Sequence, residues 1–328
     1  MRVCVVLLNW NGWRDTLECL DSLFQSHHSA FSVIVCDNAS SDSSAAEIAQ
    51  WADKTLGSEA FESLTKVQVE SGRCLTKATR LALVANGANL GFAGGNNVGV
   101  RLALNSPECE YVWLLNNDTT LDADSLGNVL ARAESDPTIG LCGSTLIYHH
   151  DQKMVQALGG ATFNRFTGRS KHIGAFSALL DVPTDPAETE RAMSYVVGAA
   201  MLVRRAFLEQ VGLMQEDYFL YYEEIDWCTR GKGKFRLGYA PNSHVFHKEG
   251  ASIGTAASGG SALSTYYLFR SRIRFTARFY PGLLAPVLTA CAWDIFKMLV
   301  KRKFNLAQAA WRGAVQLPRL SSTPRAPT

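Results

Sequence analysis

The sequence is poor in charged residues and lacks several familiar motifs. Charged residues make up 19% of its 328 residues and apolar residues 47%, which excludes a disordered chain and allows a sizeable core. The eight cysteines form no CxxC pair, so the sequence offers neither a zinc cluster nor a thioredoxin-type motif. The GxGxxG pattern is absent, and the GxxxxG spacing from Gly94 to Gly99 is followed by Val100 and Arg101, where a P-loop has Lys and then Ser or Thr. These absences argue against a Rossmann dinucleotide site and against a P-loop.

A secretory signal is also missing. Met1 and Arg2 lead into the apolar run of residues 3–8, which Asn9 ends before a signal core and a cleavage site could fit. We therefore expect the chain to stay in the cytoplasm, with its cysteines reduced.

Acidic residues are nearly absent from the C-terminal region. Residues 268–328 contain eleven Lys and Arg but a single acid, Asp294, a local balance of +10, whereas the rest of the chain carries −8. An acidic body joined to a basic tail predicts a negatively charged neighbour, either membrane headgroups or a phosphorylated substrate. Nucleic acid is not among the partners that we expect.

Short strand and helix patterns alternate through the first half of the chain. The strand candidates are residues 3–8, 31–36, 81–85 and 111–115. A helical pattern runs through Leu17, Leu20 and Phe24, and further helical patterns cover residues 42–51 and 96–104. This alternation predicts an α/β fold with a mostly parallel sheet, helices on both faces and ligands at the carboxyl ends of the strands. Residues 53–80 carry no comparable signal, and we interpret them as an insertion.

Three polar segments lie where such a sheet would bind its ligands. They are residues 37–42 (DNASSD), 116–119 (NNDT) and 89–97 (NLGFAGGNN). The glycines of the last segment either allow a tight strand-to-helix connection or form a backbone wall against a nucleotide. Asp118 either binds Mg²⁺ or Mn²⁺ beside a nucleotide diphosphate or belongs to a turn before a helix near Asp122.

The densest group of acids lies in residues 218–230 (YFLYYEEIDWCTR). Neighbouring carboxylates raise one another's pKa, which suits a general base, whereas the alternative is a solvated helix start with acids near its positive end. If a helix begins at Glu223, then Glu223 and Glu224 diverge by about 100° and Asp226 can pair with Arg230. Downstream, His247 either completes a divalent-metal site or is structural.

Six motifs in order resemble family 2 glycosyltransferases of the bacterial rhamnosyltransferase-like branch. They are residues 6–12 (VLLNWNG), 35–42 (VCDNASSD), 89–97 (NLGFAGGNN), 114–119 (LLNNDT) and 222–226 (YEEID), and His247 with Gly250 and Ser252. The resemblance implies a GT-A fold and an inverting transfer of sugar from a nucleotide donor to an acceptor hydroxyl. We accordingly divide the chain into a nucleotide-sugar-binding half (1–138), an acceptor-binding and catalytic half (139–265) and a basic amphipathic tail (266–328).

The resemblance also implies roles for single residues. Asp118 matches the last acid of the DxD motif, whose first acid is Asn116 here, and His247 matches a further ligand of Mg²⁺ or Mn²⁺. Glu224 matches the catalytic base, which is typically Asp in the family, so Glu223 remains an alternative. The expected contacts of the nucleotide sugar are Asn9, Asn11, Asp37, Asn38, Asn89, Gly91, Asn97, Asn117 and Arg270.

Two functions are open at this point. The first is transfer of a sugar, with dTDP-rhamnose as the first candidate donor, to a saccharide or lipid-linked acceptor in cell-surface polysaccharide assembly. The second is a GT-A-like binding or scaffold protein without activity, since Asn116 and Glu224 depart from the family pattern.

The tail has three interpretations of its own. Residues 282–300 are apolar but are interrupted by Asp294 and Lys297. We favour an amphipathic segment on the inner face of the membrane, with Trp293 and Phe296 at the interface. A membrane-spanning helix and a helix packed on the catalytic body are the alternatives.

Overall fold

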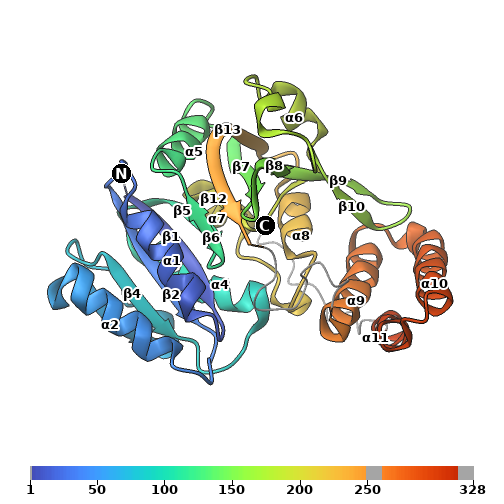
Figure 1. Cartoon of the computed structure of the whole chain (residues 1–328), viewed down its shortest axis with the longest axis horizontal. Helices are drawn as coiled ribbons and strands as arrows, with labels where there is room; N and C mark the ends of the chain where they lie inside the picture. The colour runs from blue at the N-terminus through green and yellow to red at the C-terminus, as the bar shows by residue number, and fades with distance from the viewer. Residues whose placement is uncertain (1, 249–260, 317–328) are drawn as a thin grey trace.

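One large sheet runs through the centre of the molecule. The structure is a computed structural model that describes residues 2–248 and 261–316. The strand order is β3-β4-β2-β1-β5-β12-β7-β13-β6, with β8 paired to β7 (Figure 1). The strands are β1 (Arg2–Asn9), β2 (Phe31–Asp37), β3 (Phe61–Thr65), β4 (Leu81–Ala85), β5 (Cys109–Asn116), β6 (Thr119–Leu121), β7 (Ile139–Tyr148), β8 (Asp151–Leu158), β12 (Ala200–Arg204) and β13 (Arg236–His247).

The first half of this sheet is parallel and the second half is mixed. β3, β4, β2, β1 and β5 run parallel to one another, β12 runs antiparallel between β5 and β7, and β13 runs parallel to β7. The predicted α/β class and mostly parallel sheet are confirmed, and each predicted strand lies within an observed one.

Helices cover both faces of the sheet. α1 (Trp13–Phe24), α2 (Ser44–Leu56) and α5 (Ser125–Glu134) cover one face, and α4 (Gly91–Asn105), α7 (Arg205–Val211) and α8 (Glu223–Gly231) cover the other. Alternate residues of β1 point to opposite faces, so Val5 joins the core under α1 whereas Val6 joins the core under α4. Both faces are therefore closed to water, and the ends of the strands are left for ligands.

The interpretation of residues 53–80 as an insertion is wrong. β3 forms the edge of the main sheet, parallel to β4, and a capping box of Thr65 and Gln68 starts α3 (Lys66–Glu70). The strand carries a weak signal because Leu64 is its only buried residue. An edge strand that meets solvent does not need a continuous apolar run.

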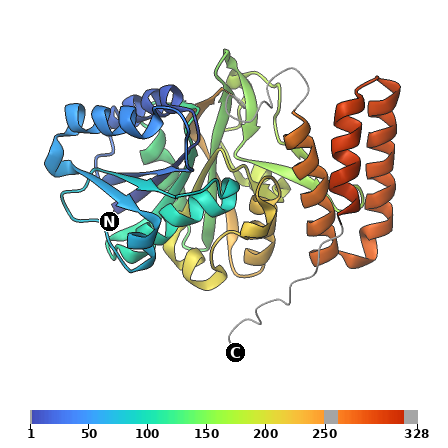
Figure 2. The same cartoon turned by 90° about the horizontal axis from the view of Figure 1, so that it is seen from below.

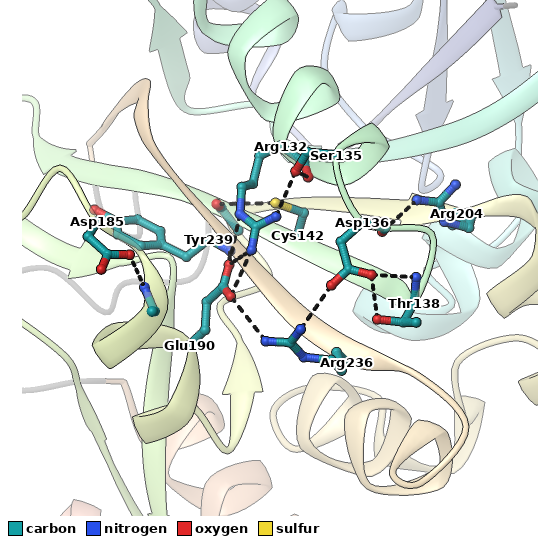
Figure 3. Close-up of polar contacts among 12 residues, drawn as sticks. Arg132, Ser135, Asp136, Thr138, Cys142, Asp185, Glu190, Arg204, Arg236 and Tyr239 are labelled. Atoms are coloured by element: carbon teal, nitrogen blue, oxygen red, sulfur yellow. Dashed lines mark hydrogen bonds and ion pairs between the residues drawn. The ribbon is translucent and has the colours of Figure 1, made fainter.

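A cluster of charges around the buried Glu190 joins the two halves of the chain (Figure 3). Glu190, on α6 (Ala187–Ala192), is buried and accepts hydrogen bonds from Arg132 of α5 and from the backbone N–H of Tyr239 on β13. Arg236 lies 3.7 Å from Glu190 and 2.9 Å from Asp136. The cluster fixes α6 against the main sheet beside a smaller sheet of β9 (Gly160–Asn164), β10 (Arg169–His172) and β11 (Tyr195–Val196).

Three C-terminal helices form a bundle at one end of the molecule, next to β10 (Figures 1 and 2). They are α9 (Ala262–Phe279), α10 (Leu284–Val300) and α11 (Phe304–Val315). Phe269, Val287, Cys291 and Ala310 form their shared core. The division that we expected at residue 265 falls inside α9, whereas the division at residue 138 falls immediately before β7.

Candidate active site

The carboxyl ends of β1, β2 and β5 meet in a network of hydrogen bonds. The buried Asp37 carboxylate accepts bonds from Asn9 Nδ2 at 2.8 Å, from Ser40 Oγ at 2.6 Å and from the Ser40 backbone N–H at 3.0 Å. Asn9 Oδ1 accepts a bond from Thr16 Oγ1 at 2.9 Å, and Asn117 Nδ2 donates to the same hydroxyl at 3.0 Å. This network fixes the loops that follow three neighbouring strands.

A second set of contacts shapes the start of α4. Asn38 Nδ2 donates to Asn89 Oδ1 at 3.1 Å and to the Gly91 carbonyl at 3.2 Å, and Asn89 Oδ1 also accepts from the Gly91 N–H at 3.0 Å. Gly91 has a φ of +71°, and a Cβ added there would lie 2.3 Å from the carbonyl oxygen of Phe219. Both the conformation and the close approach require glycine. The structure thus brings Asn38, Asn89 and Gly91 together.

Two further predicted donor contacts have different surroundings. Asn11 Oδ1 accepts a bond from the Ser41 N–H at 2.8 Å, so it joins the loops after β1 and β2. Asn97 is fully buried, and its amide bonds the backbone of Met214 and the carboxylate of Glu216. Both polar atoms of Asn97 are therefore used to hold α4 against the 214–216 segment, which gives this residue a structural role.

Asp118 and His247 come together at the end of β5. Asp118 Oδ1 lies 3.3 Å from His247 Nε2, and Asn116 Nδ2 lies 3.3 Å from the same nitrogen. His247 Nδ1 lies 3.0 Å from Gln156 Oε1, which can only accept, so in the neutral ring Nδ1 carries the proton. In this tautomer Nε2 accepts from Asn116 Nδ2, and the Asp118 carboxylate is a second acceptor beside it, so their separation suits a shared cation.

This donor set fits a divalent metal that uses few protein ligands. One carboxylate and one imidazole match Mg²⁺ or Mn²⁺ when phosphate oxygens fill the remaining positions. Within residues 2–248 and 261–316, no three His, Cys, Asp or Glu side chains gather into a site of their own. Gly250 and Ser252, which accompany His247 in the motif, lie outside the described residues.

The three acids at the start of α8 have three different environments. Asp226 is fully buried, and it pairs with Arg230 at 2.5 Å and with Arg278 at 3.2 Å, which confirms the predicted pair with Arg230. Glu223 is 2% exposed, and its Oε2 has no hydrogen-bond partner among the described residues. Burial, followed by the neighbouring charge of Glu224, raises the pKa of Glu223 well above its usual range.

Glu224 alone of the three opens into a cavity. It lines a space of about 660 Å³ that also touches Val197, Tyr195 and Tyr221. Burial raises the pKa of the Glu224 carboxyl, and hydrogen bonds from its own N–H and from the Gly198 N–H oppose that shift. A Cβ on Gly198 would lie 2.6 Å from Glu224 Oε1, so the carboxylate rests directly on this glycine.

Residues 198 and 199 connect the acid to the strand that carries Asp118. The Asn116 backbone N–H donates to the Ala199 carbonyl at 2.9 Å, and the preceding residue, Gly198, packs against the Glu224 carboxylate. A single dipeptide therefore separates the Glu224 carboxylate from the end of β5. Sequence reasoning missed Gly198 and Gln156, because neither lies in a recognisable motif and both act only through the fold.

Two aromatic rings link Arg270 to the segment before α8. Its guanidinium carbon lies 5.9 Å from the centre of the Tyr267 ring, and Tyr267 stacks on Phe219 at 4.6 Å. The Phe219 carbonyl accepts a bond from the Phe92 N–H at 2.7 Å, beside Gly91. These contacts tie α9 to the start of α4.

Comparisons with known proteins agree with this arrangement. Residues 4–212 match the family model described as glycosyl transferase family 2. The chain belongs to glycosyl transferase family 2. The match ends before α8, so the acids of that helix and His247 lie beyond it.

Curated relatives of this glycosyltransferase include rhamnosyltransferases. The rhamnosyltransferase WbbL of Escherichia coli is 27% identical over 199 residues, covering 57% of this chain and 74% of the relative. A Mycobacterium tuberculosis protein named N-acetylglucosaminyl-diphospho-decaprenol L-rhamnosyltransferase is 27% identical over 210 residues, covering 58% and 67%. A Haloferax volcanii hexosyltransferase of low-salt glycan biosynthesis is 20% identical over 239 residues, covering 71% and 74%.

Solved structures confirm the GT-A fold. A mannosyltransferase of Pyrobaculum calidifontis, in complex with GDP-mannose and Mn²⁺, aligns over 96% of this chain and 86% of its own, with a TM-score of 0.55 and 14% identity. The structure of GalNAc-T7 with UDP, GalNAc and Mn²⁺ covers 86% and 49%, with a TM-score of 0.60 and 12% identity.

Proposed function

We propose that this glycosyltransferase moves a sugar, with inversion, from a nucleotide diphosphate to a hydroxyl of a saccharide or lipid-linked acceptor. The first candidate donor is dTDP-rhamnose, since two relatives bear the name of rhamnosyltransferases. The name of the mycobacterial relative supports a lipid-linked acceptor, and that of the archaeal one supports a role in glycan biosynthesis, which we propose is the assembly of a cell-surface polysaccharide. A cytoplasmic location at the inner face of the membrane is part of the same proposal.

One observation carries this proposal. The Ala199 carbonyl accepts a bond from the backbone of Asn116, and the neighbouring Gly198 lies against the Glu224 carboxylate. A base and a phosphate-binding site must lie on opposite sides of one anomeric carbon for an in-line displacement with inversion. The short connection through residues 198 and 199 supports such a spacing.

The chain's own residues would divide the work as follows. Glu224 accepts the proton of the attacking hydroxyl, and the Gly198 N–H orients its carboxylate. Asp118 and His247 would hold Mg²⁺ or Mn²⁺, and a bound cation of this kind neutralises charge on a leaving diphosphate. On the donor side, Asp37, Asn9, Asn11, Asn38, Asn89, Gly91 and Asn117 shape the nucleotide pocket.

A direct test uses donor binding and turnover. Calorimetry with dTDP, UDP and GDP, each with and without Mn²⁺, should give one preferred nucleotide and a gain in affinity from the metal. Incubation of the matching sugar nucleotides should then release free nucleotide diphosphate. The alternative function is an inactive binding or scaffold protein, and it is favoured by Asn116, which replaces an acid of the DxD motif. Binding of a nucleotide sugar with Mn²⁺ but without any turnover would support that alternative.

We also propose that the helical bundle rests on an anionic membrane. Trp293 and Phe296 stack on the outside of α10 and are 56% and 52% exposed, and Lys301 follows at its end. Residues Pro281–Val300 are long and apolar enough to cross a membrane, with 11% of that stretch buried in the structure. Asp294 favours a surface position, because a charge at the centre of a bilayer is costly and this one is bonded to Arg169 of the body.

A further inference from the structure

The cavity that contains Glu224 extends from the catalytic body to the helical bundle. Its walls include Tyr195 of β11, Glu224 of α8, Phe269 of α9 and Met298 of α10. At about 660 Å³, it exceeds the space that one sugar needs and has the size of a pocket for a drug-sized ligand. The proton-accepting group lies on one wall, and the opposite wall belongs to the C-terminal helices.

The part of the cavity next to the bundle is strongly cationic. Five cationic side chains line the cavity against two carboxylates, Glu224 and Asp294, and they are Arg169, Arg272, Lys297, Lys301 and Lys303. Asp294 already binds three of them, at 3.2 Å to Arg169 Nε, 3.0 Å to Arg272 Nη1 and 2.9 Å to Lys297 Nζ. Although burial opposes ionisation, these bonds hold the pKa of Asp294 below its usual range. The five cations therefore outnumber the carboxylates of the cavity, and the Asp294 carboxylate among them stays ionised.

The two remaining cations are available for a ligand. Lys301 and Lys303 form no ion pair within the part of the chain that the structure describes, and both lie in the turn between α10 and α11. The buried Arg272 is held in place by Asp294 and by the Thr167 carbonyl, so it adds positive charge behind the two lysines. Ammonium groups are common partners of phosphate oxygens.

Apolar side chains accompany the cations. Leu268, Met298 and Leu306 line the cavity, and Val300 and Phe304 are exposed close by in sequence, at 65% and 61%. A ligand that enters between the body and the bundle therefore meets cations and hydrocarbon on the same side.

We infer that the cavity binds a lipid-linked diphosphate acceptor, with its diphosphate at Lys301 and Lys303 and its sugar hydroxyl at Glu224. This inference rests on the proposed function, because it treats Glu224 as the base. It assigns the lipid to the Leu268 and Leu306 side, next to the exposed face of the bundle. The donor diphosphate has its own site at Asp118, so the two diphosphates of the reaction are bound by different chemistry, a metal on one side and side-chain cations on the other.

The test compares three lysine and arginine substitutions in one turn. Lys301→Gln and Lys303→Gln, alone and together, are measured against Arg302→Gln, which removes one charge from the same turn but is not part of the cavity wall. The full chain is titrated calorimetrically with farnesyl diphosphate in EDTA, which removes the metal that a donor diphosphate would require. We expect the double variant to bind about tenfold more weakly or worse, and Arg302→Gln to bind like the wild type.

Inorganic pyrophosphate and farnesol separate the possible sources of binding. Both should bind the wild type more weakly than farnesyl diphosphate does. If pyrophosphate binds as tightly as farnesyl diphosphate, the cavity is a site for free phosphate. If Arg302→Gln loses as much affinity as the double lysine variant, the binding is general electrostatic attraction. Either result overturns the inference. Nucleotide diphosphate affinity with Mn²⁺ should be unchanged in every variant. Failure of nucleotide binding in the wild type would instead count against the proposed function.

Discussion

Among single residues, Gly198 decides where the Glu224 carboxylate can lie. A methyl group at this position would stand 2.6 Å from Glu224 Oε1, so Gly198→Ala must push the carboxylate away. We expect kcat to fall about 10- to 100-fold, since general bases depend on hydrogen-bond distance, with the Kd of the donor unchanged. Single-turnover transfer and donor calorimetry measure the two quantities. Full activity in Gly198→Ala would show that the base lies elsewhere.

Glu223 and Glu224 are distinguished by their surroundings. Glu224→Gln keeps shape but removes basicity, so the transfer rate should drop about 10²–10⁴-fold with donor affinity nearly unchanged. Glu223→Gln replaces a buried carboxyl whose raised pKa already favours the neutral form, so transfer should stay within a few-fold of wild type. The opposite pattern, a dead Glu223→Gln and an active Glu224→Gln, would reverse the assignment.

The pKa of Glu224 predicts the acidic side of the pH profile. The base must be ionised to act, and burial raises its pKa, so activity should be lost as the pH falls through a value above the ordinary value for glutamate of about 4.3. A plot of kcat/KM against pH measures this directly. An acidic limb at or below that ordinary value would contradict the raised pKa.

Among the helices, α10 carries the membrane hypothesis. Trp293→Ser with Phe296→Ser removes two exposed aromatic rings without touching the buried Cys291, so the fold should persist while sedimentation with anionic liposomes decreases. The matched control is Val67→Ser with Phe176→Ser, which removes side chains of similar exposure from the catalytic body. Equal sedimentation of both double variants would remove α10 from the membrane contact.

The elements differ in how far the sequence predicts them. Strands β1, β2, β4 and β5 were predictable because buried parallel strands have continuous apolar runs. The edge strand β3 was not predictable, because most of its residues are not buried. α4 begins five residues before the predicted start at Asn96. Its first turns contain glycines, which have a low helix propensity, so tertiary contacts must stabilise this part of the helix.

The contacts of the site also differ in how far the sequence predicts them. The proximity of Asp118 and His247 followed from motifs, and their distance of 3.3 Å in the structure agrees with it. The contact of Gln156 with His247 could not be predicted, because it depends on β8 folding back beside β7. The commitment of Asn97 to Met214 was hidden for the same reason, since 117 residues separate the two.

For the whole molecule, the Glu190 cluster stabilises the junction between the halves. Glu190→Ala leaves Arg132 without its carboxylate and the Tyr239 N–H without its acceptor, so the free energy of unfolding should fall by about 3 kcal/mol. Arg236→Ala should cost at most about 1 kcal/mol, because that side chain is 59% exposed. Urea unfolding of both variants measures the difference, and similar losses would mean that the cluster is not a unit.

The hydrogen-bond network at the ends of β1, β2 and β5 also has a consequence for the thermodynamics of donor binding. Asn9, Asp37, Thr16 and Asn117 already bond one another, so these loops have given up their conformational freedom during folding. These side chains are preorganised, so they lose little conformational entropy when a nucleotide binds. The entropy of donor binding should therefore be dominated by released water and by the ligand, with little contribution from the β1, β2 and β5 loops.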